Sequence, residues 1–326
     1  MLLWCLFLGL GVVFGSPGDR SPYFRGCRGR CEGGCPPGGG TTADGTAFTY
    51  PEAVLQWSCE EDCVYACMWR VEREMAAAGY PPVKYFGKWP FRRVLGVQEL
   101  ASSAFSLGNM LPHVVYLAAY REAYAPAHYR LAPLWLGFSW MGVWTWTWST
   151  VFHARDTWWT ERLDYHGATA LLLYSLFAAA VRVFHLRRLG VAVAGVLCAA
   201  ALGGVVWYLN VVKFDYGVLG CAARASPCLH PNVGLNMVVA LATGASSSAV
   251  WVYWAWRDKR PYRYKAVLFV VCLHAAAGFE VLDFPPWWGL VDAHAVWHFI
   301  TIFLGFLWYS FLCDDNAYEA QQVKLE

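Results

Sequence analysis

Three histidines, an aspartate and a serine occur at spacings that could build a metal-dependent hydrolytic site. Ser149 precedes His153 by four residues, and His294 precedes His298 by four, so each pair lies on one face of a helix. Asp164 follows a short distance after His153 in the sequence. Three imidazoles match the three protein ligands of a catalytic zinc site, whose fourth position is left for water. The spacing therefore predicts zinc bound by His153, His294 and His298.

The two remaining residues suit the chemistry of such a centre. Zinc lowers the pKa of its bound water to about 7, so hydroxide becomes available at neutral pH. Asp164 is expected to orient or deprotonate the water, or to hydrogen-bond a ligand histidine. Ser149, one turn from His153, is expected to bind the water or the developing oxyanion.

Two other kinds of site remain open at this stage. A b-type haem also uses histidines on facing helices, but it gives no role to Ser149 or Asp164. A serine triad normally carries its nucleophile on a strained turn, whereas Ser149 is expected in the middle of a helix. Zinc is the interpretation that uses all five residues.

The composition identifies the kind of protein that must position these residues. Of 326 residues, 58% are hydrophobic and 15% are charged, whereas soluble domains carry about 25% charged residues. The 19 Trp suit a chain that meets membrane interfaces repeatedly. With 25 Lys and Arg against 23 Asp and Glu, the chain lacks the basic excess of a nucleic-acid-binding protein. We predict an all-α polytopic membrane protein that binds no nucleic acid.

Hydropathy beyond Pro90 alternates in blocks long enough to cross a bilayer. The blocks predict a bundle of seven transmembrane helices over residues 97–312, followed by a cytosolic tail over 313–326. The seven expected spans are 97–119, 133–153, 164–184, 189–211, 231–255, 265–284 and 292–312.

The N-terminus and the loop charges predict the orientation of this bundle. Residues 1–15 form a short apolar run typical of a cleaved signal peptide, which places the following segment in the lumen. Nine Lys and Arg residues then fall in loops on the cytosolic side and four in loops on the lumenal side, in agreement with the positive-inside rule. In this topology the five candidate residues all lie at the lumenal end of the bundle.

Residues 16–96 contain no spanning segment but carry six cysteines in two C-x3-C-x3-C triplets. These are Cys27, Cys31, Cys35, Cys59, Cys63 and Cys67. After a signal peptide the compartment is oxidising, so disulfides are expected, and a zinc site is the alternative. Six cysteines allow 15 pairings, among which the sequence does not choose. We predict a small disulfide-rich lumenal domain, because a segment of this size lacks a hydrophobic core large enough to fold without disulfides.

Six further polar residues fall within or beside the predicted spans: Glu99, Asn109, His113, His274, Glu280 and Asp283. Glu99 and Asn109 are expected to form hydrogen bonds between helices. Glu280 and Asp283 are placed near the lumenal end of the 265–284 span, where they either surround the site or contact interfacial water. The two histidines nearer the membrane centre receive no assignment.

Five short motifs stand out in and around the predicted spans: FGKWPF at 86–91, STVFHARD at 149–156, FDYG at 214–217, LDFPP at 282–286 and DAHAVWH at 292–298. Together they resemble the post-GPI-attachment-to-proteins factor 3 family. This family lies within a superfamily of seven-helix membrane hydrolases that includes alkaline ceramidases and the adiponectin and progestin receptors. The cysteine-rich lumenal domain fits this family and not the ceramidases.

The resemblance implies a phospholipase A2-like acyl ester hydrolase of the Golgi membrane. Such a protein would remove the sn-2 acyl chain from the phosphatidylinositol of GPI-anchored proteins, so its partners would be those proteins and membrane lipids. By position, His153, His294 and His298 would bind zinc, and Asp164 and Ser149 would assist attack on the ester. The alternative is a non-catalytic receptor or assembly factor with a structural zinc site, which is usually closed by a fourth protein ligand.

Overall fold

The computed structural model describes residues 16–325 except 39, 124–129 and 213–234. The predicted signal peptide, residues 1–15, and the motif at 214–217 lie outside the described residues. Within the described part, the regular structure is helical, and β-structure is limited to isolated bridges. The expectation of an all-α fold is confirmed for these residues.

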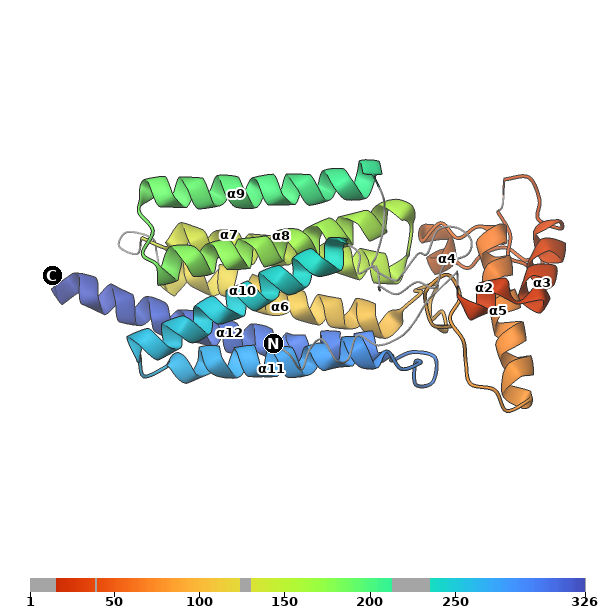
Figure 1. The fold of residues 1–326 in the computed structure, drawn as a ribbon. Coiled ribbons are helices and arrows are strands. Elements are labelled where there is room, and N and C mark those ends of the chain that lie inside the picture. The colour runs from red at the N-terminus through yellow and green to blue at the C-terminus, as the bar shows by residue number, and fades with distance from the viewer. Residues whose placement is uncertain (1–15, 39, 124–129, 213–234, 326) are drawn as a thin grey trace, which may run out of the picture.

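Seven helices of 20 or more residues run along one another in the described part of the chain (Figure 1). They are α6 (Leu100–Ala123), α7 (Ala132–Ala154), α8 (Trp158–Val183), α9 (Arg188–Trp207), α10 (Leu235–Asp258), α11 (Arg263–Leu282) and α12 (Ala293–Leu325). A short π-helix, η1 (Tyr208–Val212), extends α9.

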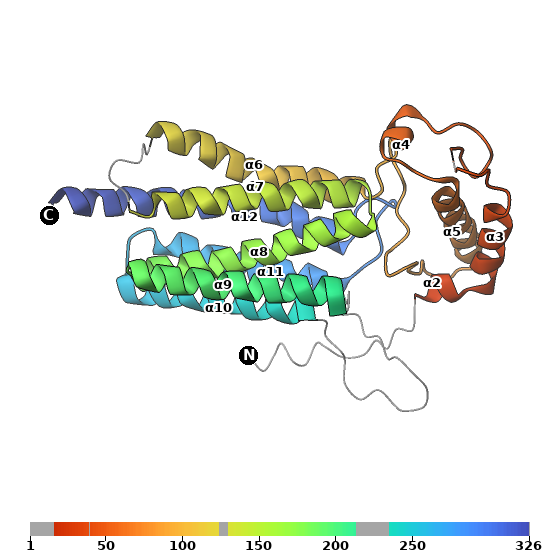
Figure 2. The same ribbon diagram turned by 90° about the horizontal axis from the view of Figure 1, so that it is seen from above.

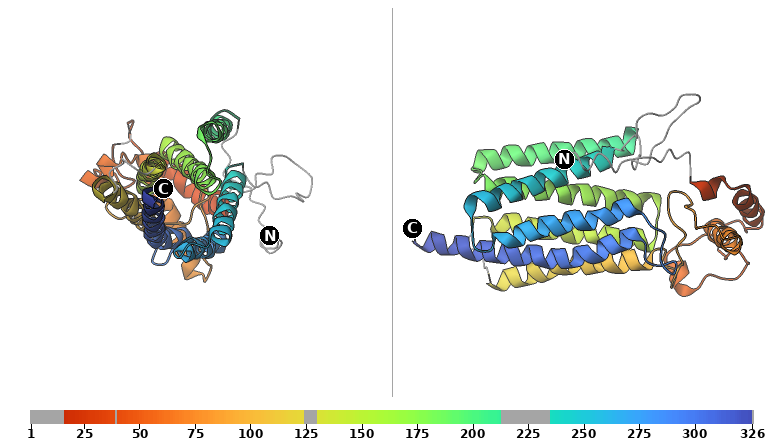
Figure 3. Two further views of the ribbon diagram at one scale, coloured as in Figure 1. Left: turned by 90° about the vertical axis from the view of Figure 1, so that its left-hand side faces the viewer. Right: turned by 60° about the horizontal axis from the view of Figure 1, so that its bottom comes forward.

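The helix contacts close most of the bundle into a ring. In order around it, α6 contacts α7, α7 contacts α8, α8 contacts α10, α10 contacts α11, α11 contacts α12, and α12 returns to α6. Helix α9 packs on the outside of α8, as the end-on view in Figure 3 shows. Side chains that point into the ring are therefore shielded from the surroundings of the bundle.

Two helix boundaries differ from the predicted ones by more than four residues. Helix α8 begins at Trp158, so Asp164 lies in its second turn and not at its start. The early start has a local cause, because the Thr157 side chain caps the helix by accepting a hydrogen bond from the backbone N–H of Thr160. Helix α12 continues to Leu325, so the segment expected as a separate tail from residue 313 is a helical extension.

Four of the described helices are long and apolar enough to cross a membrane by length and composition. They are α8, α9 with η1, α10, and α12 as far as Gln321. Only 6% of the apolar window of α9 is buried, so this helix turns its apolar side chains outward, as a lipid-facing helix does. The chain therefore has the character of a membrane protein, as predicted.

Helices α6, α7 and α11 are not among these four, and α6 and α7 carry polar residues on their buried faces. Ser102, Ser106 and Asn109 of α6 are buried, as are Thr145 and Ser149 of α7. These groups lower the hydropathy of each helix without exposing polar atoms to the outside of the bundle.

The bundle end that carries the C-terminus of α12 is held by aromatic packing and a buried ion pair. Trp254 and Phe311 are fully buried there and contact each other edge to face. Arg182 of α8 makes two 2.7 Å contacts with the carboxylate of Asp315 on α12, and both side chains are almost completely buried. The ion pair fixes α8 against α12.

The cysteine-rich module, residues 16–77, lies at the opposite end of the bundle (Figure 2). It consists of α2 (Pro17–Arg20), α3 (Pro22–Glu32), α4 (Tyr50–Val54) and α5 (Cys59–Ala77). Its disulfides join Cys27 to Cys67, Cys31 to Cys63 and Cys35 to Cys59. Both triplets have a four-residue period, so two antiparallel helices bring the sulfurs together in register.

This nested pairing is one of the 15 possible pairings. It also argues against zinc bound by these cysteines. Cys35, Cys59 and Cys63 lie close enough to share an ion. Their sulfurs are already joined in disulfides, however, and the thiolate is the form that binds zinc. The expectation of a disulfide-rich domain is confirmed.

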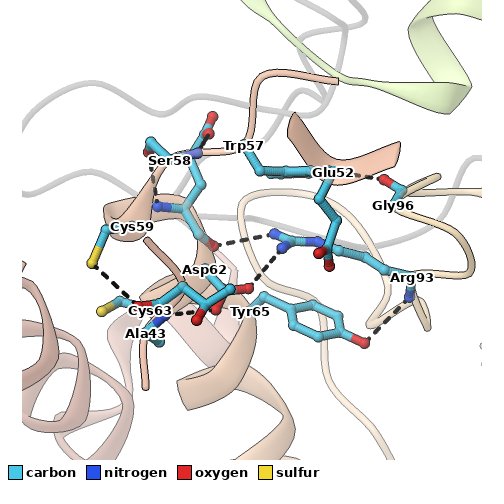
Figure 4. A network of polar contacts seen from close by, with 12 residues as sticks. Ala43, Glu52, Trp57, Ser58, Cys59, Asp62, Cys63, Tyr65, Arg93 and Gly96 are labelled. Carbon is cyan, nitrogen blue, oxygen red and sulfur yellow. Dashed lines mark hydrogen bonds and ion pairs between the residues drawn. The ribbon is translucent and has the colours of Figure 1, made fainter. Parts of the chain in front are cut away.

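A tryptophan between two arginines docks the module onto the bundle. The guanidinium carbon of Arg93 lies 3.5 Å from the ring centre of Trp57, and that of Arg155, in the α7–α8 loop, lies 3.9 Å from it. Arg93 also bonds Asp62 at 3.0 Å, as Figure 4 shows, and Arg155 bonds Glu61 at 2.6 and 2.7 Å. The module is thus anchored two residues beyond His153.

Candidate metal centre

The structure brings His153, His294 and His298 together inside the ring of helices. His153 is in the last turn of α7, and the other two occupy the first turns of α12. The ring centre of His153 lies 5.2 Å from that of His294 and 5.1 Å from that of His298. The ring centres of His294 and His298 lie 4.4 Å apart. One nitrogen from each ring falls within 4.8 Å of the others.

The contacts of these rings fit a bound cation. Nε2 of His294 and Nε2 of His298 face each other at 2.8 Å, and two imidazole lone pairs at that distance repel unless a proton or a cation lies between them. His153 and His298 are buried, and Nδ1 of His298 is a buried atom without a hydrogen-bond partner among the described residues. Three imidazole nitrogens form a donor set that suits zinc.

Glu99 determines which nitrogen of His153 faces this group. Its Oε2 lies 2.7 Å from Nδ1 of His153, and its backbone N–H donates to the His153 carbonyl at 2.9 Å. With Nδ1 engaged by the carboxylate, Nε2 is the nitrogen of His153 that can face a metal ion. A carboxylate behind a histidine is a recurrent support of metal ligands. A hydrogen bond was expected for Glu99 and is present, but the position of this carboxylate behind a candidate metal ligand was missed.

Asp164 and Ser149 lie beside the histidines. The Asp164 carboxylate interacts with His153 and His294 and has the Ser149 hydroxyl as a hydrogen-bond partner. Oγ of Ser149 also lies 3.0 Å from Oγ of Ser106 on α6, and both serines are buried. Ser106 had not been singled out, because one serine in an apolar helix carries no distinguishing pattern. The Ser106 hydroxyl has one proton, which it can donate either to Ser149 or to a carbonyl of its own helix.

Two further polar residues hold the first turns of α12 in place. The Asp292 carboxylate accepts a hydrogen bond from the backbone N–H of Ala295 at 2.8 Å, which caps the helix. Asn109 of α6 donates from Nδ2 to the carbonyl of His298 at 2.7 Å, so its expected role between helices is confirmed. These bonds fix the backbone that carries both α12 histidines.

Other polar residues considered from the sequence lie outside this cluster. Asp283 accepts a 2.9 Å hydrogen bond from Trp89 and pairs with Lys84 at 2.5 Å, so it fastens the linker between module and bundle. His113 contacts Tyr309 at 2.6 Å inside the bundle, and Nδ1 of His274 contacts the carbonyl of Val270. The side chain of Glu280 lies outside the described residues.

The geometry also bears on the haem alternative. A haem with two axial histidines has one on each side of the porphyrin plane. Here the three rings touch one another, at centre separations of 4.4 to 5.2 Å, which leaves no space for a porphyrin between them. The cluster suits a single ion.

Sequence similarity to known proteins extends over nearly the whole chain. The model of the Per1-like family matches residues 50–222 and 227–316. A relative from Danio rerio, named GPI-specific phospholipase A2-like PGAP3, is 37% identical over 330 residues, covering 98% of each chain. A Mus musculus relative of the same name is 36% identical over 97% of this chain and 94% of its own. Post-GPI attachment to proteins factor 3 from Drosophila melanogaster is 35% identical over 94% of this chain and 91% of its own.

Proposed function

The chain belongs to the Per1-like family, and on that premise we propose that it is a GPI-specific phospholipase A2-like hydrolase. It removes the sn-2 acyl chain from the phosphatidylinositol of GPI-anchored proteins during fatty-acid remodelling. The observation that carries the proposal is the convergence of His153, His294 and His298 beside Asp164 and Ser149. The names of its relatives supply the substrate class.

In this proposal all seven long helices cross the Golgi membrane, with the cysteine-rich module in the lumen and the end of α12 in the cytosol. The outward apolar face of α9 supports contact with lipid. Trp158 and Trp288 are strongly exposed at the module end, where tryptophans suit the headgroup region. The histidine cluster, at the same end, then lies near the depth of a phospholipid ester.

The three histidines would hold zinc, which supplies Lewis-acid polarisation of the ester carbonyl and an activated water at neutral pH. Asp164 accepts the proton of the attacking water and returns it to the departing glycerol oxygen. Ser149 keeps the Asp164 carboxylate oriented, and Ser106 holds the Ser149 hydroxyl in turn. Water thereby cleaves the ester into a free fatty acid and a lyso-lipid with a free 2-hydroxyl.

The module is placed to meet the remainder of the substrate. It lies at the bundle end that carries the histidines, and Arg155 joins it to the loop that follows His153. A lipid in the lumenal leaflet would present its ester to the bundle and its glycan and attached protein to the module. The partners are therefore GPI-anchored proteins and the surrounding membrane lipids.

The second candidate is a receptor or assembly factor in which zinc is only a structural clamp. Structural zinc sites are usually closed by four protein ligands. In this cluster the fourth neighbour is Asp164, which Ser149 engages through a hydrogen bond, and this arrangement favours an open catalytic position.

Metal analysis and a lipase assay on the same purified preparations test both candidates. Zinc per chain is quantified, and the release of sn-2 fatty acid from a GPI lipid is followed for the wild type, His298→Ala and Asp164→Asn. We expect His298→Ala to lose zinc and release, and Asp164→Asn to keep zinc while release falls by about 10²–10⁴-fold. Asp314→Asn, near the opposite end of the bundle, is the matched control.

Each other outcome has a definite meaning. Zinc without hydrolysis in the wild type would favour the structural clamp. Full activity of Asp164→Asn would remove the role of that carboxylate as the base. A wild-type protein without zinc would overturn the metal centre itself.

A further inference from the structure

A lysine outside the bundle reaches the carboxylate that supports His153. Lys88 lies in the linker between α5 and α6, and its Nζ is 2.7 Å from Oε1 of Glu99. The same Nζ is 2.7 Å from Oδ2 of Asp156 and 4.3 Å from the ring centre of Phe152. One ammonium therefore lies between two carboxylates at the end of α7.

The two oxygens of Glu99 have separate partners. Oε1 contacts Lys88, and Oε2 contacts Nδ1 of His153. Burial alone would lower the pKa of Lys88, but the carboxylates of Glu99 and Asp156 more than offset it and hold this pKa above its usual value. The ammonium therefore stays charged and compensates two acidic groups that would otherwise repel each other.

The disulfide-bonded module holds the turn that presents Lys88. The turn contains Phe86 and Gly87 with positive φ angles of 49° and 84°. The backbone N–H of Phe86 donates to Asp19 at 2.5 Å, and that of Gly87 donates to Ser16 at 2.7 Å. Tyr85, which precedes the turn, is buried in the module core. The folding of the module thus sets the position of the Lys88 ammonium.

We propose that Lys88 is a positioning residue of the metal centre, through which the cysteine-rich module holds Glu99 against His153. The ammonium fixes the rotamer of the Glu99 carboxylate, and this carboxylate fixes the ring of His153 with Nε2 toward the other histidines. The module is in this sense part of the site and not only a cover over it. The inference rests on the proposed zinc hydrolase but concerns how its ligand is held.

Lys84 provides a matched comparison within the same linker. It also pairs with a carboxylate on the bundle side, Asp283, and lies over the ring of Trp89. Both lysines link the module to the bundle, but of the two only Lys88 contacts Glu99. An effect due to docking alone would appear on losing either lysine.

The test uses full-length protein in detergent and measures zinc affinity by competition with a chelator, together with sn-2 fatty acid release. We expect Lys88→Met to weaken zinc binding by about 10–100-fold, as removal of such supporting groups does. Lys84→Met should bind zinc as the wild type does, and Lys88→Arg, which keeps the charge, should recover most of the affinity. Disulfide mapping and thermal unfolding verify that each variant is folded.

The remaining outcomes separate this inference from the proposed function. Unchanged zinc affinity of Lys88→Met, or an equal loss in Lys84→Met, would overturn the role of Lys88 even if the wild type is a hydrolase. Weakened zinc binding in Lys88→Met with no hydrolysis by the wild type would support Lys88 and overturn the hydrolase. If Lys88→Met does not fold, Lys88→Gln serves in its place under the same criteria. A wild type without zinc would overturn both.

Discussion

Oε2 of Glu99 lies 2.7 Å from Nδ1 of His153, although 54 positions separate the two residues in the chain. The contact selects the nitrogen that His153 presents to the other histidines. Replacing Glu99 with Gln keeps the shape of the side chain but removes the charge that orients the ring. We expect zinc affinity to fall by about 10–100-fold.

Chelator competition on the purified Glu99→Gln variant measures this loss. Glu319→Gln is the control, because Glu319 contacts Arg182 and Arg260 far along α12. Equal zinc affinity of Glu99→Gln and the wild type would show that the ring of His153 is held by other contacts.

Ser149→Ala removes the hydroxyl that orients Asp164 but leaves all three histidines. We expect kcat to fall by about 10²-fold, the scale of losing one preorganised donor, while zinc stays bound. Ser106→Ala, one hydroxyl further from Asp164, should have a smaller effect. Steady-state kinetics together with metal analysis checks this order, and a larger loss in Ser106→Ala would contradict it.

Trp57→Ala removes the ring that lies between Arg93 and Arg155. The free energy of unfolding should fall by about 3–5 kcal/mol, as for other buried aromatic truncations. The linker should also become sensitive to limited proteolysis, because two guanidinium contacts are lost together. Tyr50→Ala alters an exposed aromatic residue of the same module and should change neither property. Wild-type protease resistance in Trp57→Ala would show that the module docks by other means.

The module should lose stability as pH rises, because of Glu72. Burial raises the pKa of its carboxyl above the usual 4.5, although the backbone N–H of Val83 donates to it at 3.4 Å. The folded module then binds this proton more tightly than the unfolded chain. Its contribution to stability is complete below pH 4.5 and is lost as pH rises through the raised value.

Hydrogen exchange of α5 in the full-length protein, corrected for the intrinsic rate at each pH, measures this dependence. Glu72→Gln should flatten it and should raise protection at neutral pH. Glu74→Gln, on an exposed side chain of the same helix, is the control. A pH dependence that persists in Glu72→Gln would assign it to another group.

The Arg182–Asp315 pair predicts a non-additive result at the other end of the bundle. Arg182→Met leaves the buried Asp315 carboxylate with the Tyr262 hydroxyl, and Asp315→Leu leaves the buried Arg182 with Glu319. Each single variant loses the main opposite charge and should lower the free energy of unfolding by about 3–5 kcal/mol. The double variant should be more stable than either single variant, since both charges are then absent. Thermal unfolding in one detergent completes the cycle, and additive losses would show that the two side chains act independently.

Much of this protein is determined locally and was therefore predictable. Blocks of apolar residues of membrane-spanning length predict the long helices, and four-residue spacing places Ser149 with His153 and His294 with His298. The match to the Per1-like family agrees with the resemblance that the motifs carry.

Where hydropathy was the only guide, the start of α8 and the end of α12 were predicted incorrectly. The charged residues before Asp164 predicted a loop, yet they lie in the first turns of α8, whose N-terminus is capped by Thr157. Asp315 was expected in a polar tail, yet it forms an ion pair with Arg182 and is buried inside the bundle. A local average of hydropathy cannot detect a polar side chain whose partner belongs to a distant helix.

The sequence alone determined an all-α membrane chain, a cysteine-rich segment before the bundle and the five residues of the candidate site. Only the tertiary structure decided the pairing of the six cysteines, the carboxylate behind His153 and the lysine behind that carboxylate. The reason is physical: helical periodicity fixes which residues share a face of one helix. Which faces of different helices meet depends on the packing of the whole chain.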